Sequence, residues 1–373
     1  MRLIAAISFL LLILPIDSYG ATSYVICAKR SNGALSVRTR CASSHRKVSN
    51  LSSLVGATGA NGADGNDGAV RVYGNGSAGS LTITEATSLS SVNNQYTDIT
   101  IIAGQTLTVP SGTTLRCTGT FLNNGTIVVS PAGYGGLIRA YGGTAPSLIA
   151  STLASKGLSE HPAENGDVGT SSGDIWFGYG GRPVTTAFAK NLLIPHPFAG
   201  GAGGGTFATS GGSGGGSLRI ACQGAMYNAG TIAADGQGTA SAAGGGAGGL
   251  IILASGEQVT NTGSISVNGG VGGNSVGGGD HAASGGGGGG VVHLISPIAP
   301  VTGTITATGG AGGTAGGSVT SSPRGAGAGG GSFYGTGGSG SYVTTDNSTG
   351  GGSAGTDGMS FSTTADPLSL MIN

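Results

Sequence analysis

The sequence predicts a mainly β fold in which β-solenoid-like repeats alternate with glycine-rich polyglycine II layers. Glycine supplies 81 of the 373 residues, whereas charged residues make up 8% and aromatic residues 5%. Short β-branched runs are separated by Gly and Asn turn signals, which is typical of many short strands. A unit of glycine run, strand, turn and short strand recurs in the C-terminal half, so the units must stack to close a core.

Residues 1–20 have the pattern of a secretory signal peptide. Arg2 precedes an apolar stretch over 3–16, and Ser18 and Gly20 provide small residues before a cleavage point at Ala21. The apolar stretch is short for a membrane span, and no later run is long and apolar enough to be one. We therefore expect an exported chain, extracellular or at the cell surface, without a transmembrane segment.

Residues 21–55 form a basic head that two cysteines bracket. Cys27 and Cys41 flank two β-prone runs joined by the turn signal Asn32-Gly33, so we expect a hairpin closed by a Cys27–Cys41 disulfide. The head carries six basic residues and no acidic one, a charge of +6. This charge suits either a solvated hairpin or contact with an anionic envelope or partner. The basic residues are Lys29, Arg30, Arg38, Arg40, Arg46 and Lys47.

Residues 56–70 are expected to form a short collagen-like neck. Glycine recurs at every third position from Gly56 to Gly68, the spacing that a triple helix requires because only glycine fits at its axis. Apolar residues at helical spacing over 48–55 precede the run, which favours a homotrimer with a parallel three-chain bundle. A calcium site at Asp64, Asn66 and Asp67 is disfavoured because the spacing of a calcium loop is absent.

Residues 71–143 are expected to be a β-solenoid segment, and residues 200–373 a glycine-rich repeat tip. The strand-like runs of the first segment are 99–102, 106–109, 114–117 and 126–129. In the tip, strands over 218–222, 250–253 and 291–295 each follow a glycine block and lead to a Gly-Thr-Ile or Gly-Ser-Ile turn. Cys117 and Cys222 follow similar Leu-Arg runs, so they occupy equivalent core positions either as free thiols or as a disulfide.

The glycine blocks admit two interpretations. Ordered polyglycine II helices allow backbones to pack closer than any side chain permits and to hydrogen-bond sideways. Flexible linkers are the alternative. The repetition of the intervening strands favours the ordered form, because linkers have no need to repeat.

The candidate ligand-binding residues are aromatic, because the chain has few aromatics and glycine layers offer no side chains to hold a partner. Residues 144–199 read as an insertion that carries the single tryptophan, and Arg182, Asp174 and His161 could add polar contacts there. The alternative is that Trp176 and Phe177 plug the solenoid where the insertion joins it. The candidates are Trp176, Phe177, Tyr179, Phe333, Tyr334 and Tyr342.

Several function classes find little support. The 15 acidic residues are scattered, without the paired carboxylates of a solenoid hydrolase or lyase, and no nucleophile-elbow sequence follows a strand and opens a helix. The 15 basic residues balance the acidic ones, which disfavours nucleic-acid binding. We therefore expect no enzyme activity, no cofactor and no metal.

The order of signal peptide, Cys-bracketed head, Gly-x-y run and β-rich tip resembles bacterial collagen-like surface fibres. The blocks 285–290, 325–331 and 335–340 resemble the polyglycine II motifs of phage tail-fibre adhesins, which bind receptors through the loops between motifs. The resemblance implies a surface fibre or adhesin that recognises a cell-surface glycan or protein receptor. The alternatives are a structural matrix or coat protein and, in third place, a carbohydrate-active β-solenoid enzyme.

Overall fold

The structure is a computed structural model of the whole chain. It describes residues 25–29, 35–47, 64–90, 94–131, 159–161, 182–183, 200–205, 210–240, 242–275, 282–315, 326–332, 334–341 and 350–371. The chain divides into two compact units, Met1–Gly65 and Asn66–Asn373. Each unit is described by itself.

The first unit contains a small antiparallel sheet. Strand β1 (Val25–Lys29) lies between β2 (Leu35–Arg38) and β3 (His45–Lys47). Cys27 in β1 forms the predicted disulfide with Cys41, and their Cα atoms are 5.5 Å apart. The hairpin prediction lacked β3. This strand pairs with the free edge of β1, which requires the chain to fold back after β2 and so brings Cys41 within reach of Cys27.

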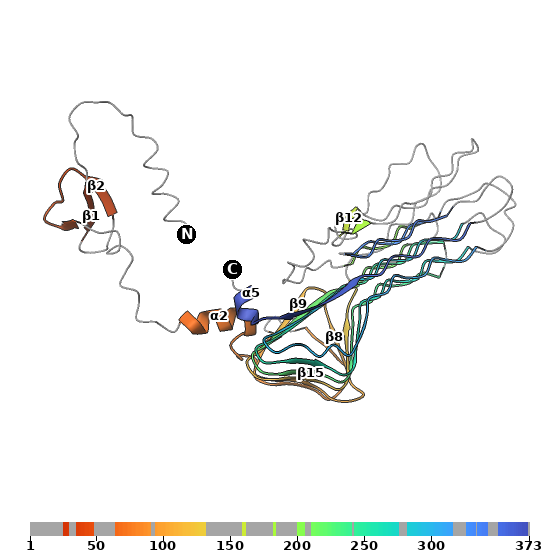
Figure 1. Ribbon diagram of the computed structural model, residues 1–373, viewed down its shortest axis with the longest axis horizontal. Coiled ribbons are helices and arrows are strands. Elements are labelled where there is room, and N and C mark those ends of the chain that lie inside the picture. The colour runs from red at the N-terminus through yellow and green to blue at the C-terminus, as the bar shows by residue number, and fades with distance from the viewer. Residues whose placement is uncertain are drawn as a thin grey trace, which may run out of the picture. The chain divides into compact units, whose positions relative to one another are not determined.

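The second unit is built on three parallel sheets (Figure 1). The first sheet contains β4 (Leu81–Ile83), β7 (Ile99–Ile101), β10 (Phe121–Asn123), β15 (Met226–Asn228) and β18 (Val259–Asn261). The second contains β5 (Thr87–Ser88), β8 (Thr106–Val109), β11 (Thr126–Val129), β16 (Thr231–Ala233), β19 (Ser264–Ser266) and β21 (Thr304–Thr306). The third contains β6 (Gln95–Tyr96), β9 (Thr113–Cys117), β14 (Ser217–Cys222), β17 (Leu250–Ser255), β20 (Val291–Ser296) and β22 (Met359–Thr364).

The chain passes through the first, second and third sheets in turn, and each such winding stacks on the one before it. Corresponding strands of successive windings pair in parallel, as β8 with β11 and β11 with β16. The windings superpose in Figure 1 into a three-sided outline, with β15, β8 and β9 marking its sides. This arrangement confirms a mainly β protein of stacked parallel strands and is compatible with the predicted repeats. Strands from 71–143 and 200–373 lie in the same sheets.

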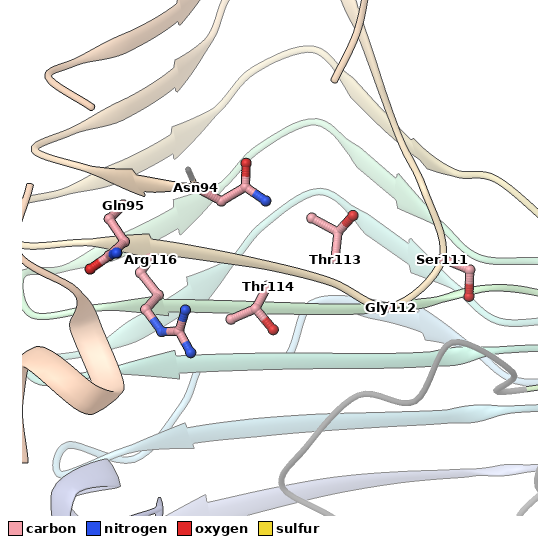
Figure 2. A pocket seen from close by; sticks show the side chains of 7 residues that line it. All are labelled: Asn94, Gln95, Ser111, Gly112, Thr113, Thr114 and Arg116. Carbon is pink, nitrogen blue, oxygen red and sulfur yellow. The ribbon is translucent and has the colours of Figure 1, made fainter. Parts of the chain in front are cut away.

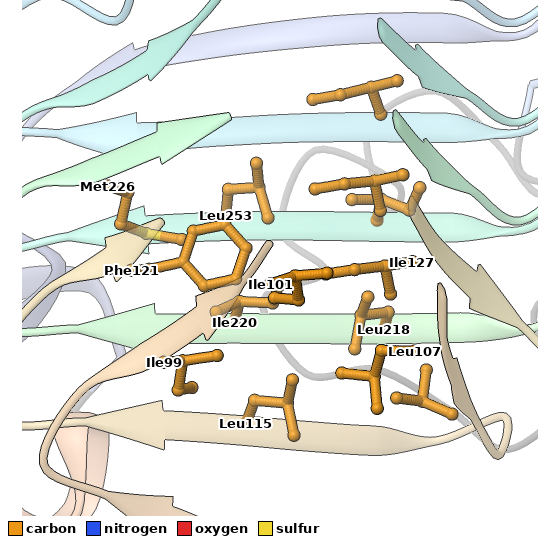
Figure 3. Close-up of a cluster of buried hydrophobic side chains, with 14 of the residues drawn as sticks. Ile99, Ile101, Leu107, Leu115, Phe121, Ile127, Leu218, Ile220, Met226 and Leu253 are labelled. Atoms are coloured by element: carbon orange, nitrogen blue, oxygen red, sulfur yellow. The ribbon is translucent and has the colours of Figure 1, made fainter. Parts of the chain in front are cut away.

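The core fills the space between the three sheets (Figure 3). Alternate residues of each strand point inward, because side chains in a strand alternate between its two faces. In β9, for example, Leu115 and Cys117 are fully buried, whereas Thr114 and Arg116 lie on the outer face. Stacked strands of matching pattern therefore place apolar side chains of successive windings in one continuous core.

A buried row of asparagines follows the corner between the first and second sheets. Asn123, Asn228 and Asn261 occupy equivalent positions in β10, β15 and β18. Asn123 Nδ2 donates to Asn228 Oδ1 at 2.7 Å, and Asn228 Nδ2 donates to Asn261 Oδ1 at 2.6 Å. The row satisfies polar groups that would be costly to bury unpaired. It explains why an asparagine stands two residues before the glycine in these three turns.

Cys117 and Cys222 form a second disulfide inside the core. They are register partners on the neighbouring strands β9 and β14. The bond closes a sequence separation of 105 residues that includes the whole insertion. The disulfide alternative of the sequence analysis is therefore the one present in this structure.

The third sheet is buried on both faces at β14, β17 and β20. Two helices cover part of its outer face, α2 (Asp64–Tyr73) and α5 (Pro367–Met371). Val72 and Tyr73 of α2 pack in one apolar cluster with Ile252 and Ala254 of β17. The apolar outer residues of these strands are thereby removed from water.

Helix α2 corrects the C-terminal part of the predicted collagen-like neck. Residues 64–70 are α-helical, whereas 56–63 and the apolar stretch 48–55 lie outside the described residues. The physical reason lies beyond the glycine repeat. Ala69, Val72 and Tyr73 form an apolar helical face that packs on the third sheet, and this tertiary contact outweighs the low helix propensity of Gly65 and Gly68.

Between the second and third sheets, the later windings make long excursions of glycine-rich backbone (Figure 1). The described segments, which we call the glycine layer, are 200–205, 210–216, 234–239, 242–249, 267–275, 282–290, 307–315, 326–332, 335–341 and 350–358.

Within the glycine layer, hydrogen bonds run sideways with a period of three. In the run 285–290, the first and fourth amides donate to segment 326–332, the second and fifth to 350–358, and the third and sixth to 267–275. Carbonyls of the same segment accept from 242–249, 307–315 and 335–341. The run is therefore ordered and hydrogen-bonded on all sides, which overturns the flexible-linker alternative for these residues.

Glycine is required at these positions because neighbouring backbones touch. A Cβ atom on Gly244 would lie 1.7 Å from the carbonyl oxygen of Ala328, and one on Gly287 would lie 2.0 Å from that of Gly246. Real Cβ atoms do not approach this closely. Ordering so much glycine costs backbone entropy, and the mutual hydrogen bonds offset that cost.

Candidate functional site

One candidate site is the end of the glycine layer farthest from the sheets. Some segments of the layer run away from the second sheet, and others run back to the third sheet. The loops that connect an outgoing segment to a returning one therefore begin and end at the far end of the layer. The connection at 240–242 includes Ala242, whose φ of 28° is the one positive value among the described non-glycine residues. The other connections, 206–209, 276–281, 316–325 and 342–349, lie outside the described residues.

The structure describes one of the six predicted ligand-binding aromatics. Tyr334 is half-buried at the near end of the layer, where it packs against Phe361 of β22 with ring centroids 5.5 Å apart. Its apolar contacts with the third sheet are those of a packing residue. The other five are Trp176, Phe177, Tyr179, Phe333 and Tyr342, which lie outside the described residues.

The polar residues suggested for the insertion are described through their backbone alone. His161 belongs to β12 (Ser159–His161) and Arg182 to β13 (Arg182–Pro183), and the two short strands pair antiparallel with these residues as register partners. Asp174 lies outside the described residues. The pairing thus brings two of the three polar candidates together at the level of the backbone.

A second candidate site, which the sequence analysis did not identify, is a polar pocket of about 390 Å³ on the outer face of the third sheet (Figure 2). Strand β9 and the turn before it supply most of the lining, and the start of β6 supplies the rest. The lining residues are Asn94, Gln95, Ser111, Gly112, Thr113, Thr114 and Arg116.

Two arginines dominate the electrostatics beside this pocket. Arg116 lines it, and Arg219 of β14 is the register partner of Thr114, so both side chains leave the same face of the sheet. Arg219 is only 6% exposed. Burial, and then the positive charge of Arg116, lower the pKa of Arg219 to about 10, and burial lowers the pKa of Arg116 as well.

Three buried polar atoms of this region lack partners. Among the described residues, the Nε atoms of Arg116 and Arg219 and the Oδ1 atom of Asn94 are buried and make no hydrogen bond. Most buried polar atoms in native proteins form hydrogen bonds, so several unbonded ones close together need an explanation. The sequence feature that could have identified these two arginines was the similar Leu-Arg runs before Cys117 and Cys222. It did not indicate that the arginine side chains are buried.

His293 is another buried titratable group on this face. Its Nε2 atom lies 2.8 Å from the Thr363 hydroxyl, and its ring meets Phe361 edge-on. Burial lowers the pKa of His293 to about 4, so the ring is neutral at physiological pH. These contacts lie within the sheet packing and identify His293 as a structural residue.

Across the described part of the chain, no group of three or more His, Cys, Asp and Glu side chains is placed to hold a metal ion. The two described helices of the second unit are short, and no helix found in the described ranges could cross a membrane.

Comparison with known proteins adds no assignment to either site. The chain matches no protein-family model, no curated protein and no solved structure.

Proposed function

We propose that this protein is an exported surface fibre or adhesin that recognises a cell-surface or envelope ligand through loops on a glycine-rich scaffold. In this proposal the stacked windings form a β-solenoid, and the glycine layer is a set of polyglycine II helices. The three-residue period of the sideways hydrogen bonds supports the second point, because polyglycine II has three residues per turn.

The observation that carries the functional proposal is the construction of the glycine layer. Its segments are held on several sides by backbone hydrogen bonds, and a central one, 282–290, is buried throughout. A scaffold fixed by its backbone restricts the ends of the loops that connect its segments. Binding residues on loops positioned by a rigid scaffold are a recurrent arrangement in proteins.

The experiment tests binding and folding together. We expect Tyr342→Ala, in the far-end connection 342–349, and the double variant Trp176→Ala/Tyr179→Ala, in the insertion, to weaken adhesion to cells or to a glycan array while the melting temperature stays unchanged. Tyr227→Ala is the matched control, because Tyr227 is a 40% exposed aromatic of β15 in the first sheet. A fall in melting temperature with a proportionate loss of binding would show instead that these aromatics are core residues.

The proposal includes export through a cleaved signal peptide and assembly as a homotrimer. Since 64–73 is helical, the three-chain contact would have to involve residues before α2. Sedimentation of the exported chain tests this point: a trimer is expected, and Gly62→Val should weaken it if a triple helix forms over 56–63. A monomer would refute the oligomeric part and leave the loop-display part standing.

The second candidate function is a structural matrix or coat protein. It is favoured by the same glycine layer, because backbone packing provides strength without any ligand. If the purified chain binds no cell, glycan or envelope preparation and instead assembles with itself, the structural alternative replaces the adhesin.

A further inference from the structure

We propose that the pocket beside Arg116 and Arg219 binds an oxyanion carried on a small hydroxyl-rich molecule, such as a sugar carboxylate or a sugar phosphate. This site lies on the third sheet and does not depend on the loops or on the proposed adhesive function.

The charge of the site requires a partner. Arg219 is 94% buried, since 6% of it is exposed, and its Nε atom makes no hydrogen bond. The neighbouring Arg116 adds repulsion between like charges. Within the described residues, neither guanidinium has a carboxylate partner. Burying a charge without a partner is costly, so a bound anion would remove an existing cost as well as add favourable contacts.

The positions of the two arginines suit one shared oxyanion. Arg116 lies two residues beyond Thr114 on the outer face of β9, and Arg219 sits beside Thr114 on the neighbouring strand. Parallel strands are about 4.8 Å apart, so long side chains that start from such diagonal positions can converge on one group. Guanidinium groups bind carboxylates and phosphates with paired, charge-assisted hydrogen bonds.

The remaining lining indicates the rest of the ligand. It consists of amide, hydroxyl and backbone groups from Asn94, Gln95, Ser111, Gly112, Thr113 and Thr114, with no apolar side chain among them. The amide of Asn94 has a buried oxygen without a partner, and such amides can present either oxygen or nitrogen to a ligand. A volume of about 390 Å³ is at the lower end of the range for small-molecule sites. These features fit a single polar ring.

The test uses calorimetric titration of the full chain with glucuronate, with glucose 6-phosphate and with neutral glucose. We expect one or both anions to bind and to raise the melting temperature, and the neutral sugar to do neither. Glucuronate and glucose 6-phosphate distinguish carboxylate from phosphate recognition. Binding of all three with equal affinity, or of none, would overturn the proposal.

Two variants then assign the binding to the arginines. Arg116→Met and Arg219→Met should each weaken anion binding at least tenfold without lowering the melting temperature, since each removes a guanidinium whose buried Nε has no hydrogen-bond partner and relieves the repulsion between the two. The control Arg71→Met makes the same charge change at an exposed position of α2 and should bind normally. Equal affinity in all three variants would refute the site.

A third variant keeps the test informative if an arginine variant misfolds. Thr114→Glu places a carboxylate between Arg116 and Arg219. If the pocket holds an oxyanion, this side chain should occupy the same position, raise the melting temperature and abolish binding of the free anions. A lower melting temperature together with unchanged anion binding would contradict the proposal.

Discussion

Asn123 and Asn228 are 105 residues apart in the sequence, yet the Nδ2 atom of one donates a 2.7 Å hydrogen bond to the Oδ1 atom of the other. The contact passes directly from one winding to the next. All the residues between β11 and β14, including the insertion, are accommodated within that single winding. The stack therefore keeps its register across the longest interruption in the described fold.

The first prediction concerns the middle of this asparagine row. Asn228→Ala removes an acceptor from Asn123 and a donor to Asn261, and it leaves buried polar groups without these partners. We expect a loss of about 3 kcal/mol in the free energy of unfolding. Thr260→Ala, on the outer face of the next strand, should change it by less than about 0.5 kcal/mol. Denaturant titration measures both, and equal effects would show that the row contributes no special stability.

The second prediction uses two glycines of the layer in contrasting surroundings. On Gly287 a Cβ would lie 2.0 Å from Gly246 O, whereas on Gly351 the nearest atom would be Gly313 O at 3.6 Å. Gly287→Ala should therefore destabilise the second unit by about 3 kcal/mol. Gly351→Ala should be neutral or stabilise it by about 0.5 kcal/mol through reduced entropy of the unfolded chain. Similar melting temperatures for the two variants would argue against close packing at Gly287.

Amide exchange provides the third prediction. The six amides of 285–290 all donate to neighbouring backbone segments, at distances of 2.7–3.1 Å. We expect them to exchange as slowly as amides of the central strand β17. The exposed turn at Asn75 is a suitable fast reference, since its amide bonds to a side chain. Exchange of 285–290 at random-coil rates would contradict the ordered layer.

The fourth prediction concerns the core disulfide. Replacing both Cys117 and Cys222 by Ala opens a loop of about 105 residues, for which chain entropy gives a loss of about 5 kcal/mol. The matched control is Cys27→Ala/Cys41→Ala, which opens the disulfide of the first unit. This control should leave the melting temperature of the second unit unchanged. An unaffected second unit in the Cys117/Cys222 variant would show that the core does not rely on this bond.

The fifth prediction is a pH dependence that arises from His293. Its pKa is about 4 in the folded chain and about 6.5 when unfolded, so between these values the unfolded state binds more protons. Stability should therefore fall as the pH is lowered from 7 to 4, with a contribution of about 3 kcal/mol from this residue. His293→Gln should remove that part of the dependence. If the stability of the wild type and of His293→Gln fell equally with pH, groups other than His293 would cause the acid sensitivity.

The strands were the most predictable part of the fold. The runs over 106–109 and 126–129 coincide with β8 and β11, because buried apolar residues alternate there with outward-facing ones. The three-residue strands β10, β15 and β18 carry too short a pattern to be recognised. The hydrogen-bonded row of Asn123, Asn228 and Asn261 depends on windings far apart in the sequence, which no local pattern brings together.

Features set by packing against distant elements could not be predicted. Helix α2 contains glycines in phase with a triple helix, and only its contact with the third sheet explains its conformation. The same holds for Arg219. Its Leu-Arg run resembles that of Arg116, yet the register places Arg219 beside Thr114, where it becomes buried. The pocket is thus a product of strand register, which no local pattern specifies.

The final winding shows how the glycine layer can be enlarged. Between its outgoing segment 307–315 and its last returning segment 350–358, it contains an additional pair, 326–332 and 335–341. Because the chain enters and leaves this pair at the far end of the layer, the pair is inserted without any change in the strands or in their register. Duplication of such a glycine-rich pair therefore adds a further loop in one genetic step. For the same reason, foreign peptides can be inserted in these loops without redesign of the three parallel sheets.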